Sequence, residues 1–341
     1  MLYRLAQKAL FLADPETAQH VALEGLKAGA AVGATRLICN ATNWPVECMG
    51  LTFPNPVGLA AGLDKDGDYI DALGSLGFGF IEIGSVLPRP QPGNPRPRVF
   101  RLPGVKGVIN RLGFNSKGVA HTVSQLEKRS YEGILGVNIG KNRETPVADA
   151  LDDYLYCMER VYAHADYITV NISSPNTEGL RELQHGEYLD SLLSGLCTAR
   201  ARLADRYGRC LPLLVKVAPD LERAQIGNMA DAFARHRIDG VIATNTTTER
   251  DGVEGLPHAG EPGGLSGAPL LPRANAVLRR FRAALPDEIV LVGLGGITRG
   301  ADAAEKVSLG ASLVQFYTGM IYQGPALIGD SIAAIRAQEA P

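Results

Sequence analysis

The sequence predicts an α/β fold, a (β/α)8 barrel that follows a small helical N-terminal extension. Short apolar runs of strand length recur along the chain, and each ends in polar, glycine or lysine residues. Segments with helical spacing of apolar residues separate nearly all of these runs, which is typical of parallel strands joined by helical crossovers. Eight such units occupy ~250 residues. A chain of 341 residues therefore has room for a separate segment before the barrel.

Eight apolar runs are the expected barrel strands, and together they predict a TIM barrel. They lie at residues 57–60, 80–83, 134–137, 167–170, 213–217, 240–243, 289–292 and 313–316. The helical patterns lie at residues 66–76, 147–163, 187–205, 221–235, 270–284 and 300–308. Because such barrels carry their active sites at the carboxyl ends of the strands, the residues that follow each run are the candidates for function.

The first 35 or so residues differ in character from the rest of the chain. Apolar residues recur at helical spacing between residues 2 and 12, and Asp14 and Pro15 then resemble a helix cap and a first helical residue. We expect residues 1–40 to form a helical extension and residues 41–341 to form the barrel domain. The helices are either a cap over one end of the barrel or an interfacial hairpin that touches lipid, and the pattern alone favours the cap. No apolar run is long enough for a membrane span, and a cleaved signal is not expected.

The composition excludes some classes of function. Thirty-four Lys and Arg residues oppose 36 Asp and Glu residues, and a net charge of −2 does not favour nucleic acid as a partner. The five cysteines show neither C-x-x-C spacing nor an adjacent histidine, which disfavours a metal site and favours free thiols in a reducing cytosol. They are Cys39, Cys48, Cys157, Cys197 and Cys210.

A proline-rich insertion, residues 87–102, follows the second expected strand. Prolines at this density exclude a helix, and residues 99–102 have the character of a small edge hairpin. A disordered linker is the plain alternative, but the position inside a barrel favours an ordered loop. The next loop, residues 110–114, is expected to fold over the mouth of the barrel.

Residues 168–177 are the most informative stretch, because a buried strand there ends in a cluster of small polar side chains. This cluster contains Asn171, Ser173, Ser174, Asn176 and Thr177, and further asparagines stand at positions 110 and 245. One isolated loop asparagine is usually turn chemistry. Together they offer paired donors and acceptors without net charge, which suits a small polar heterocycle as substrate.

Two lysines add positive charge to these strand ends. Lys216 lies within the apolar run 213–217, where a lysine must be exposed at one end, paired or functional, and we favour function. Lys65 lies in a polar loop, where a surface role and a functional role are equally plausible readings. Lys216 could also be the nucleophile of a Schiff-base aldolase.

Glycine-bearing loops follow one another late in the chain. They lie at residues 263–267, 293–297 and 317–319, and the last two follow the expected seventh and eighth strands. Barrels commonly bind a phosphate there, on backbone amides that glycine leaves accessible. The pattern predicts a phosphate site.

These segments together resemble the dihydroorotate dehydrogenase family. The matching segments are residues 61–65, 110–114 and 171–177, Lys216, and residues 244–246, 264–267, 295–297 and 317–319. The resemblance runs from the N-terminal helices to the last barrel unit and points to the class 2, quinone-dependent, membrane-associated form. Two features select that class: Ser174, where class 1 enzymes carry cysteine, and the N-terminal extension, which class 1 enzymes lack.

The resemblance implies FMN as the cofactor and no metal. Residues carried over to hold FMN are Ala61, Gly62, Leu63, Asp64, Lys65, Ser85, Asn138, Asn171, Lys216, Thr244, Gly267, Gly296, Tyr317 and Thr318. Residues carried over to hold dihydroorotate are Lys65, Asn110, Arg111, Leu112, Gly113, Phe114, Asn171, Asn176, Asn245 and Thr246.

The resemblance also implies the reaction: (S)-dihydroorotate is oxidised to orotate in de novo pyrimidine (UMP) biosynthesis, and electrons pass through FMN to a membrane quinone. Ser174 is the implied general base while hydride goes to FMN, with Thr177 or a water as the onward route for the proton. Lys216 is expected to stabilise negative charge on the reduced flavin.

The implied setting is the cytoplasmic face of a bacterial-type cell membrane, with a peripheral, monomeric protein. A quinone that partitions into lipid would reach the flavin through the N-terminal helices, so the resemblance favours the interfacial hairpin over the simple cap. We expect that removing residues 1–35 stops quinone turnover and membrane attachment and leaves flavin reduction intact. A tRNA dihydrouridine synthase is the nearest different flavin barrel, and the balanced charge and Ser174 disfavour it.

Overall fold

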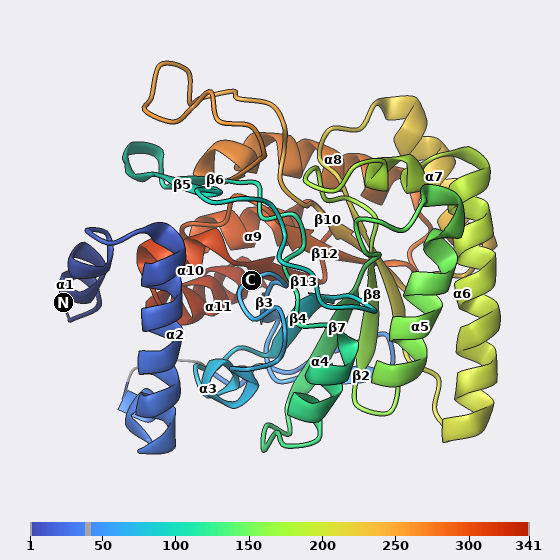
Figure 1. Ribbon diagram of the computed structural model, residues 1–341, viewed down its shortest axis with the longest axis horizontal. Helices are drawn as coiled ribbons and strands as arrows, with labels where there is room; N and C mark the ends of the chain where they lie inside the picture. Colours follow the sequence, from blue (N-terminus) through green and yellow to red (C-terminus); the bar gives the residue numbers. More distant parts are fainter. Residues whose placement is uncertain (1, 38–41, 340–341) are drawn as a thin grey trace.

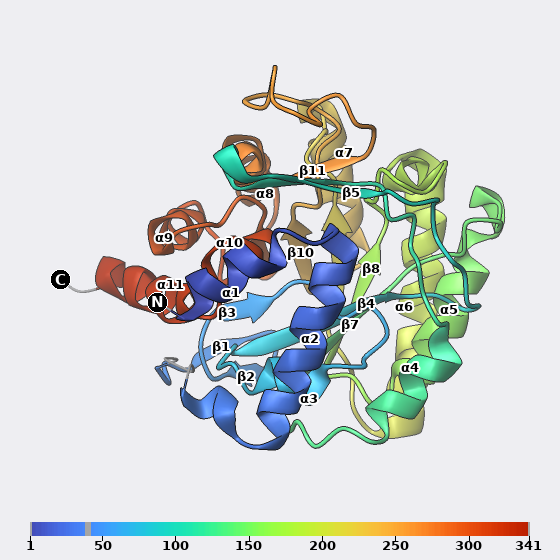
Figure 2. The same ribbon diagram turned by 60° about the vertical axis from the view of Figure 1, so that its left-hand side comes forward.

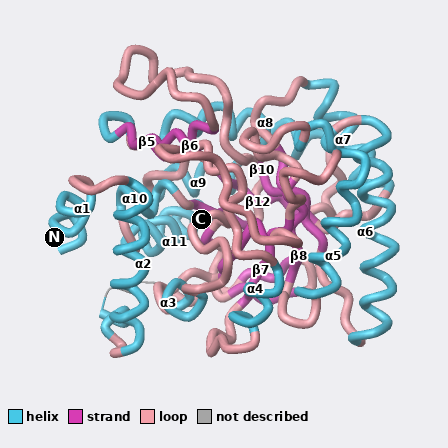
Figure 3. Tube along the Cα trace, viewed as in Figure 1, coloured by secondary structure: helices cyan, strands magenta, loops and turns pink. Residues whose placement is uncertain are grey.

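The computed structural model describes residues 2–37 and 42–339 of the chain. Eight strands form a closed parallel barrel in the order β10-β12-β13-β3-β4-β7-β8-β9. They are β3 (Val57–Leu59), β4 (Phe80–Val86), β7 (Ile134–Ile139), β8 (Tyr167–Asn171), β9 (Leu213–Val217), β10 (Gly240–Ala243), β12 (Val290–Leu294) and β13 (Leu313–Phe316). Every predicted barrel strand is present, and Figure 3 shows them at the centre with helices around them. The predicted (β/α)8 barrel is confirmed.

Helices cover the outside of the barrel (Figure 1). They are α3 (Ile70–Gly74), α4 (Val119–Leu126), α5 (Ala150–Val161), α6 (Gly186–Tyr207), α7 (Arg223–Arg235), α8 (Leu271–Ala284), α9 (Gly300–Ser308), α10 (Thr318–Gln323) and α11 (Ala326–Glu339). The sequence predicts six of them and misses α4, α10 and α11. Helix α3 is shorter than the predicted 66–76, because Asp64 accepts hydrogen bonds from the N–H groups of Gly67, Asp68 and Tyr69 and holds them in a loop.

Aromatic side chains fill the amino-terminal end of the barrel. The antiparallel hairpin of β1 (Val46–Cys48) and β2 (Leu51–Phe53) brings Phe53 edge-on to Phe80, with ring centroids 5.2 Å apart. Phe80 in turn approaches Tyr167 at 6.3 Å. Glycine is required at position 58, since a Cβ there would lie 2.3 Å from the Phe80 ring. With this end filled, space for a ligand remains at the carboxyl ends of the strands.

A small antiparallel sheet follows the proline-rich insertion. Its strands are β5 (Val99–Leu102), β6 (Gly107–Asn110) and β11 (Gly264–Gly267), with β6 in the middle. The predicted edge hairpin is confirmed as the pairing of β5 with β6. A bridge between Leu265 of β11 and Thr247 ties the sheet to the loop after β10. Figure 2 shows the sheet lying across one end of the barrel.

The N-terminal segment forms two helices, α1 (Leu2–Leu10) and α2 (Pro15–Ala31), as predicted. Asp14 caps α2 by accepting hydrogen bonds from the N–H groups of Glu16 and Thr17 at 3.1 and 3.0 Å. Helix α1 is tied to α10, since Tyr3 Oη donates to the Met320 carbonyl at 2.7 Å. The predicted boundary between extension and barrel, at residues 40 and 41, lies outside the described residues.

Exposed aliphatic side chains gather on the N-terminal helices and directly beside them, with Leu12 in the turn between α1 and α2 and Val32 just after α2. Leu5, Leu12, Val21 and Val32 are 61, 91, 54 and 80% exposed, whereas the other large exposed apolar residues of the described chain are tyrosines. In residues 2–37 and 42–339 we find no helix with the length and apolar character to cross a bilayer. Cys48, Cys157, Cys197 and Cys210 are free thiols, and Cys39 lies outside the described residues.

Short 3-10 turns complete the secondary structure. They are η1 (Ala34–Leu37), η2 (Pro103–Val105), η3 (Val147–Asp149), η4 (Leu180–Gln184) and η5 (Ala268–Leu270).

Candidate active site

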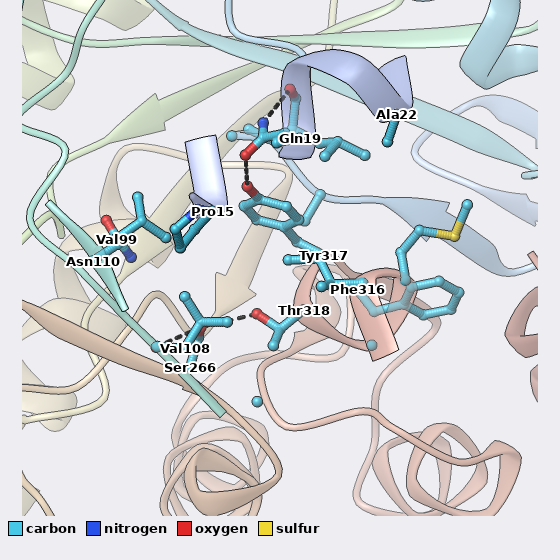
Figure 4. A pocket seen from close by; sticks show the side chains of 18 of the residues that line it. Pro15, Gln19, Ala22, Val99, Val108, Asn110, Ser266, Phe316, Tyr317 and Thr318 are labelled. Carbon is cyan, nitrogen blue, oxygen red and sulfur yellow. Dashed lines mark hydrogen bonds between the residues drawn. The ribbon is translucent and has the colours of Figure 1, made fainter. Parts of the chain in front are cut away.

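A cavity of about 1210 Å³ begins at the carboxyl-terminal mouth of the barrel and continues between the barrel and helices α1 and α2. Its barrel wall comes from the ends of strands β3, β4, β8, β9, β10, β12 and β13, and its other wall includes Pro15, Gln19 and Ala22 of α2. Figure 4 shows Gln19 reaching Tyr317 at the end of β13, with Asn110 close by. The N-terminal helices and the barrel mouth therefore share one cavity.

Ser174 and the predicted asparagines meet on one side of this cavity. Ser174 is 7% exposed, and its Oγ accepts a hydrogen bond of 3.3 Å from the Asn176 N–H. The Asn176 amide donates to the Asn110 carbonyl at 3.1 Å, and the Asn245 amide donates to Ser173 Oγ at 3.0 Å. These contacts join the loops after β8 and β10 to the end of β6. The cavity lining includes Asn110, Asn171, Ser174, Asn176, Asn245 and Thr246.

A buried carboxylate that the sequence analysis missed lies deeper in the barrel. Glu82 of β4 is 1% exposed, and four side chains donate hydrogen bonds to it. The donors are Asn138 at 2.9 Å, Tyr167 at 3.1 Å, Thr169 at 3.0 Å and Gln315 at 3.1 Å. A set made only of donors fits an ionised carboxylate. A glutamate inside the apolar run 80–83 was the available signal, and it is the same signal that singled out Lys216.

The hydrogen bonds of Glu82 extend toward the cavity through Asn138, Ser85, Asn171 and Ser173. Asn138 accepts from Ser85 Oγ at 2.5 Å, and Ser85 Oγ accepts from the Asn171 amide at 2.8 Å. Asn171 Oδ1 then accepts from Ser173 Oγ at 3.0 Å. Ser85 and Asn171 line the cavity, whereas Asn138 lies behind them. The orientation of each amide is thus fixed from the barrel core outward.

Lys216 lies on β9, beside Asn171 of β8 in the register of the sheet, and lines the cavity. The side chain is 5% exposed, and burial lowers the pKa of its ammonium group, while the negative charge of Glu82 opposes that effect. Lys216 forms no ion pair with another described residue, and it lines the cavity, where a bound group could meet the ammonium. Of the three options for this lysine, the structure excludes exposure, and a functional role stays a prediction.

Lys65 lies in the loop after β3 and also lines the cavity. Its ammonium donates a hydrogen bond of 3.0 Å to the Gly62 carbonyl. Burial lowers the pKa of Lys65 to about 8. A lysine of this kind can change its charge when an anion binds beside it.

The late glycine loops bring backbone to the cavity wall. Gly267, Gly296 and Thr318 all line it, and Ser266 Oγ lies 2.9 Å from Thr318 Oγ1. Both glycines have positive φ angles, of 88° each. A Cβ at Gly296 would lie 2.3 Å from the Leu271 Cα, so the chain can take this close course only with glycine. Such a cradle of backbone and hydroxyl groups fits a phosphate.

Four of the predicted site residues do not line the cavity, namely Asp64, Asn138, Arg111 and Gly113. The Asp64 carboxylate is used by the loop before α3, and burial raises its pKa to about 6. Arg111 instead pairs with Glu261 at 2.6 Å and lies over the Phe100 ring. The remaining predicted residues, Ala61, Gly62, Leu63, Leu112, Phe114, Thr244 and Tyr317, do line it.

The far end of the cavity contains residues that the sequence analysis did not single out. Gln19 accepts from Tyr317 Oη at 3.0 Å and donates to the Leu63 carbonyl at 3.3 Å. Arg101 of β5 lies over the Phe11 ring, 4.6 Å from its centroid, and donates to the Ala13 carbonyl. A polar residue on the apolar face of α2 was the one signal available for Gln19.

Thr177, in the loop after β8, is buried at 4% exposure. Its Oγ1 has no hydrogen-bond partner among the described residues. A buried hydroxyl without a partner costs free energy unless a ligand or water completes it.

The chain matches the family model described as "Dihydroorotate dehydrogenase" over residues 44–337. It is 54% identical over 340 residues to a protein of Herminiimonas arsenicoxydans, with 98% of each chain covered. It is 56% identical over 339 residues to a protein of Cupriavidus taiwanensis, again with 98% of each covered. Both relatives carry the name "Dihydroorotate dehydrogenase (quinone)".

Solved structures agree with these sequence comparisons. The crystal structure of DHODH from Eimeria tenella in complex with ferulenol has a TM-score of 0.86 and 35% identity, covering 95% of this chain and 92% of that one. The ligand-free form from the same organism has a TM-score of 0.84 and 36% identity, covering 93% of this chain and 95% of that one. The chain therefore belongs to the dihydroorotate dehydrogenase family, in its class 2, quinone-dependent branch.

Proposed function

We propose that this chain oxidises (S)-dihydroorotate to orotate in de novo pyrimidine (UMP) biosynthesis and passes the electrons through FMN to a membrane quinone. The observation that carries the proposal is the single cavity that joins Ser174 and the asparagines to helices α1 and α2. A polar substrate at one end and an apolar acceptor at the other can then share one cofactor between them. The name of the bacterial relatives supports the choice of acceptor.

The cavity wall has the groups that FMN requires. Lys216 offers a buried ammonium at the cavity wall, and it would hold the polar edge of the isoalloxazine. Gly267, Gly296 and Thr318 would hold the phosphate. The other FMN contacts proposed are Ala61, Gly62, Leu63, Lys65, Ser85, Asn171, Thr244 and Tyr317. Asp64 and Asn138 would support the FMN site without lining it. Asp64 would hold the loop before α3, and Asn138 would orient Ser85. When bound, FMN supplies a two-electron acceptor for hydride.

The asparagines would hold the pyrimidine ring of dihydroorotate. Their amides match ring N–H and C=O groups without adding net charge, and Lys65 would pair with the substrate carboxylate. Residues proposed to contact the substrate are Lys65, Asn110, Leu112, Phe114, Asn171, Asn176, Asn245 and Thr246, while Arg111 and Gly113 would shape the loop around it.

Ser174 would take the proton from the ring carbon next to a carbonyl. Serine is a weak base at its ordinary pKa, so it needs a route by which the proton leaves. The Asn176 N–H fixes one lone pair of Ser174 Oγ, which orients the hydroxyl. The unpartnered Thr177 hydroxyl is the nearest candidate in sequence to pass the proton on, directly or through a water.

Residues 1–40 would form the membrane-associated and quinone-associated segment, and residues 41–341 the catalytic domain. The exposed Leu5, Leu12, Val21 and Val32 support peripheral contact of the helices with lipid at the cytoplasmic face of the cell membrane. We propose that the protein acts as a monomer, and that nucleic acid and metal ions take no part in its function.

The test is a turnover assay with purified protein, dihydroorotate and a short-chain ubiquinone in detergent, in which orotate is followed by its ultraviolet absorbance. The proposal requires orotate with the quinone and none with NAD⁺ as the acceptor. Orotate formation with NAD⁺ alone, or none with either acceptor in flavin-loaded protein, would contradict it.

A further inference from the structure

A largely buried ion pair links α2 to the proline-rich loop before β5. Arg98, just before β5, is 6% exposed, and the side chain of Glu16 in the first turn of α2 is 14% exposed. The guanidinium binds the carboxylate in a bidentate manner: Nε donates to Oε2 at 3.0 Å and Nη2 donates to Oε1 at 2.9 Å. This fork geometry fixes direction as well as distance, which lysine cannot reproduce.

The third nitrogen of Arg98 organises the proline-rich loop. Its Nη1 donates to the carbonyls of Pro92 and Asn94 at 2.7 and 2.8 Å. Asn94 in turn donates through its N–H to the Leu112 carbonyl at 3.0 Å and through its amide to the Arg111 carbonyl at 2.8 Å. One side chain thus connects α2 to the backbone of residues 110–114.

The packing at this connection leaves little freedom. A Cβ at Gly93 would lie 2.3 Å from the Leu112 carbonyl oxygen and 2.8 Å from Arg98 Nη1. The Arg98 carbonyl also accepts from the Arg111 N–H at 2.8 Å. A displacement of the guanidinium is therefore transmitted to the loop rather than absorbed by a gap.

On the helix side, Glu16 stands between residues of the other cavity wall. Pro15 lines the cavity, and Gln19, almost one helical turn after Glu16, accepts from Tyr317. The charges of Arg98 and Glu16 also act on Lys65, in opposite directions. The pair therefore stands beside both the proposed substrate site and the proposed acceptor end.

We propose that the Glu16–Arg98 pair is a positioning contact that couples docking of α2 to binding of dihydroorotate by residues 110–114. The inference rests on the proposed function, which places the substrate at those residues. Because such coupling is reciprocal, orotate bound at the barrel mouth must in turn hold α2 in place. Neither residue touches the reacting atoms.

The Glu16–Arg98 pair also changes the expected effect of deleting the N-terminal helices. Deleting residues 1–35 removes the Glu16 carboxylate, so Arg98 keeps only its contacts to the carbonyls of Pro92 and Asn94 in the proline-rich loop. Flavin reduction is therefore not expected to survive this deletion intact, contrary to the expectation from sequence. We now expect the truncated protein to bind dihydroorotate more weakly as well.

Arg96 provides a matched control. Its Nε also approaches Glu16, at 3.3 Å, but the Arg96 side chain is 68% exposed. Exposed ion pairs contribute little because water and salt screen them. Arg96→Gln removes the same charge from the same partner without disturbing residues 92–94.

The experiment measures the dissociation constant of orotate, by perturbation of the flavin spectrum, in wild type, Glu16→Gln, Arg98→Lys and Arg96→Gln. It also measures kcat and KM for dihydroorotate with a soluble dye as acceptor, which bypasses the quinone. We expect Glu16→Gln and Arg98→Lys to weaken orotate binding and raise KM by about tenfold, within the range usual for coupled sites, with kcat and flavin content nearly unchanged. Arg96→Gln should behave as wild type.

Hydrogen exchange on the unsubstituted protein gives a second, independent readout. Saturating orotate should slow exchange at the amides of residues 15–31. Orotate constants within twofold of wild type in both pair variants, or α2 amides indifferent to orotate, would overturn the proposal. If the proposed function is wrong, the result differs from both of these outcomes, because the wild-type protein would then not bind orotate at all.

Discussion

Tyr317 Oη donates a hydrogen bond of 3.0 Å to Gln19 Oε1, and this contact joins the end of β13 to α2 inside the cavity. Tyr317 belongs to the proposed flavin site, and burial raises the pKa of its hydroxyl to about 12. The phenol therefore remains a hydrogen-bond donor at neutral pH. Gln19 is thus a residue of α2 that contacts the proposed flavin site directly.

Replacing Gln19 should separate the two half-reactions. Gln19→Leu removes the acceptor of Tyr317, at a cost of about 1 kcal/mol, and disorders the acceptor end of the cavity. We expect kcat/KM for the quinone to fall by roughly 5- to 30-fold, while anaerobic reduction of the flavin by dihydroorotate keeps its rate. Lys27→Gln on the exposed side of the same helix is the control. A loss confined to flavin reduction would refute the assignment.

Substrate affinity should depend on the charge of Lys65. Its pKa of about 8 means that the ammonium is charged below that pH and loses its proton as pH rises through it. Because the charged form attracts the orotate carboxylate, we expect the orotate dissociation constant to increase between pH 7 and pH 9. In Lys65→Met binding should be weaker throughout and should lose this component. A titration with the same slope in both proteins would show that another group is responsible.

Ser174→Ala tests the proposed base. The variant should retain flavin and bind orotate, yet reduce its flavin with dihydroorotate about 10² to 10⁴ times more slowly, as expected for loss of a general base. Rapid mixing without oxygen measures this rate directly. Ser174→Cys keeps a group that can accept a proton and should recover part of the rate. Flavin bleaching at the wild-type rate in the alanine variant would remove Ser174 from the mechanism.

The exposed leucines of the extension should govern attachment to lipid. Leu12 is 91% exposed, and burying such a side chain in a membrane stabilises binding by roughly 1.5–3 kcal/mol. Leu5→Asp combined with Leu12→Asp should reduce co-sedimentation with phospholipid vesicles at least tenfold without changing flavin reduction. Tyr188→Asp, an exposed apolar residue on α6, is the control. Equal binding of all three proteins to vesicles would argue against the surface.

The barrel could be predicted because each strand end carries a local signal. The runs at 57–60 and 213–217 are apolar with polar boundaries, and they became β3 and β9 with little change. The start of helix α3 could not be placed from spacing, because it is set by the Asp64 carboxylate and three N–H groups. Hydrogen bonds of this kind leave no periodic trace in the sequence.

The polar side of the candidate site was predictable for a related reason, since Asn171, Asn245 and Lys216 directly end or interrupt apolar runs. The direction of a side chain within a loop was not predictable. Arg111 follows Asn110 in the same motif, yet it turns to Glu261, which is distant in sequence. Contacts between the extension and the barrel, such as Glu16 with Arg98, likewise join surfaces that no local pattern relates.

The central claim is that the barrel mouth holds a flavin that dihydroorotate reduces. The most direct test is the visible absorption spectrum of the purified protein, recorded without oxygen before and after dihydroorotate is added. We predict a flavin spectrum that dihydroorotate bleaches and that a quinone then restores. A protein that takes up no FMN, or a bound flavin that dihydroorotate leaves oxidised, would contradict the account.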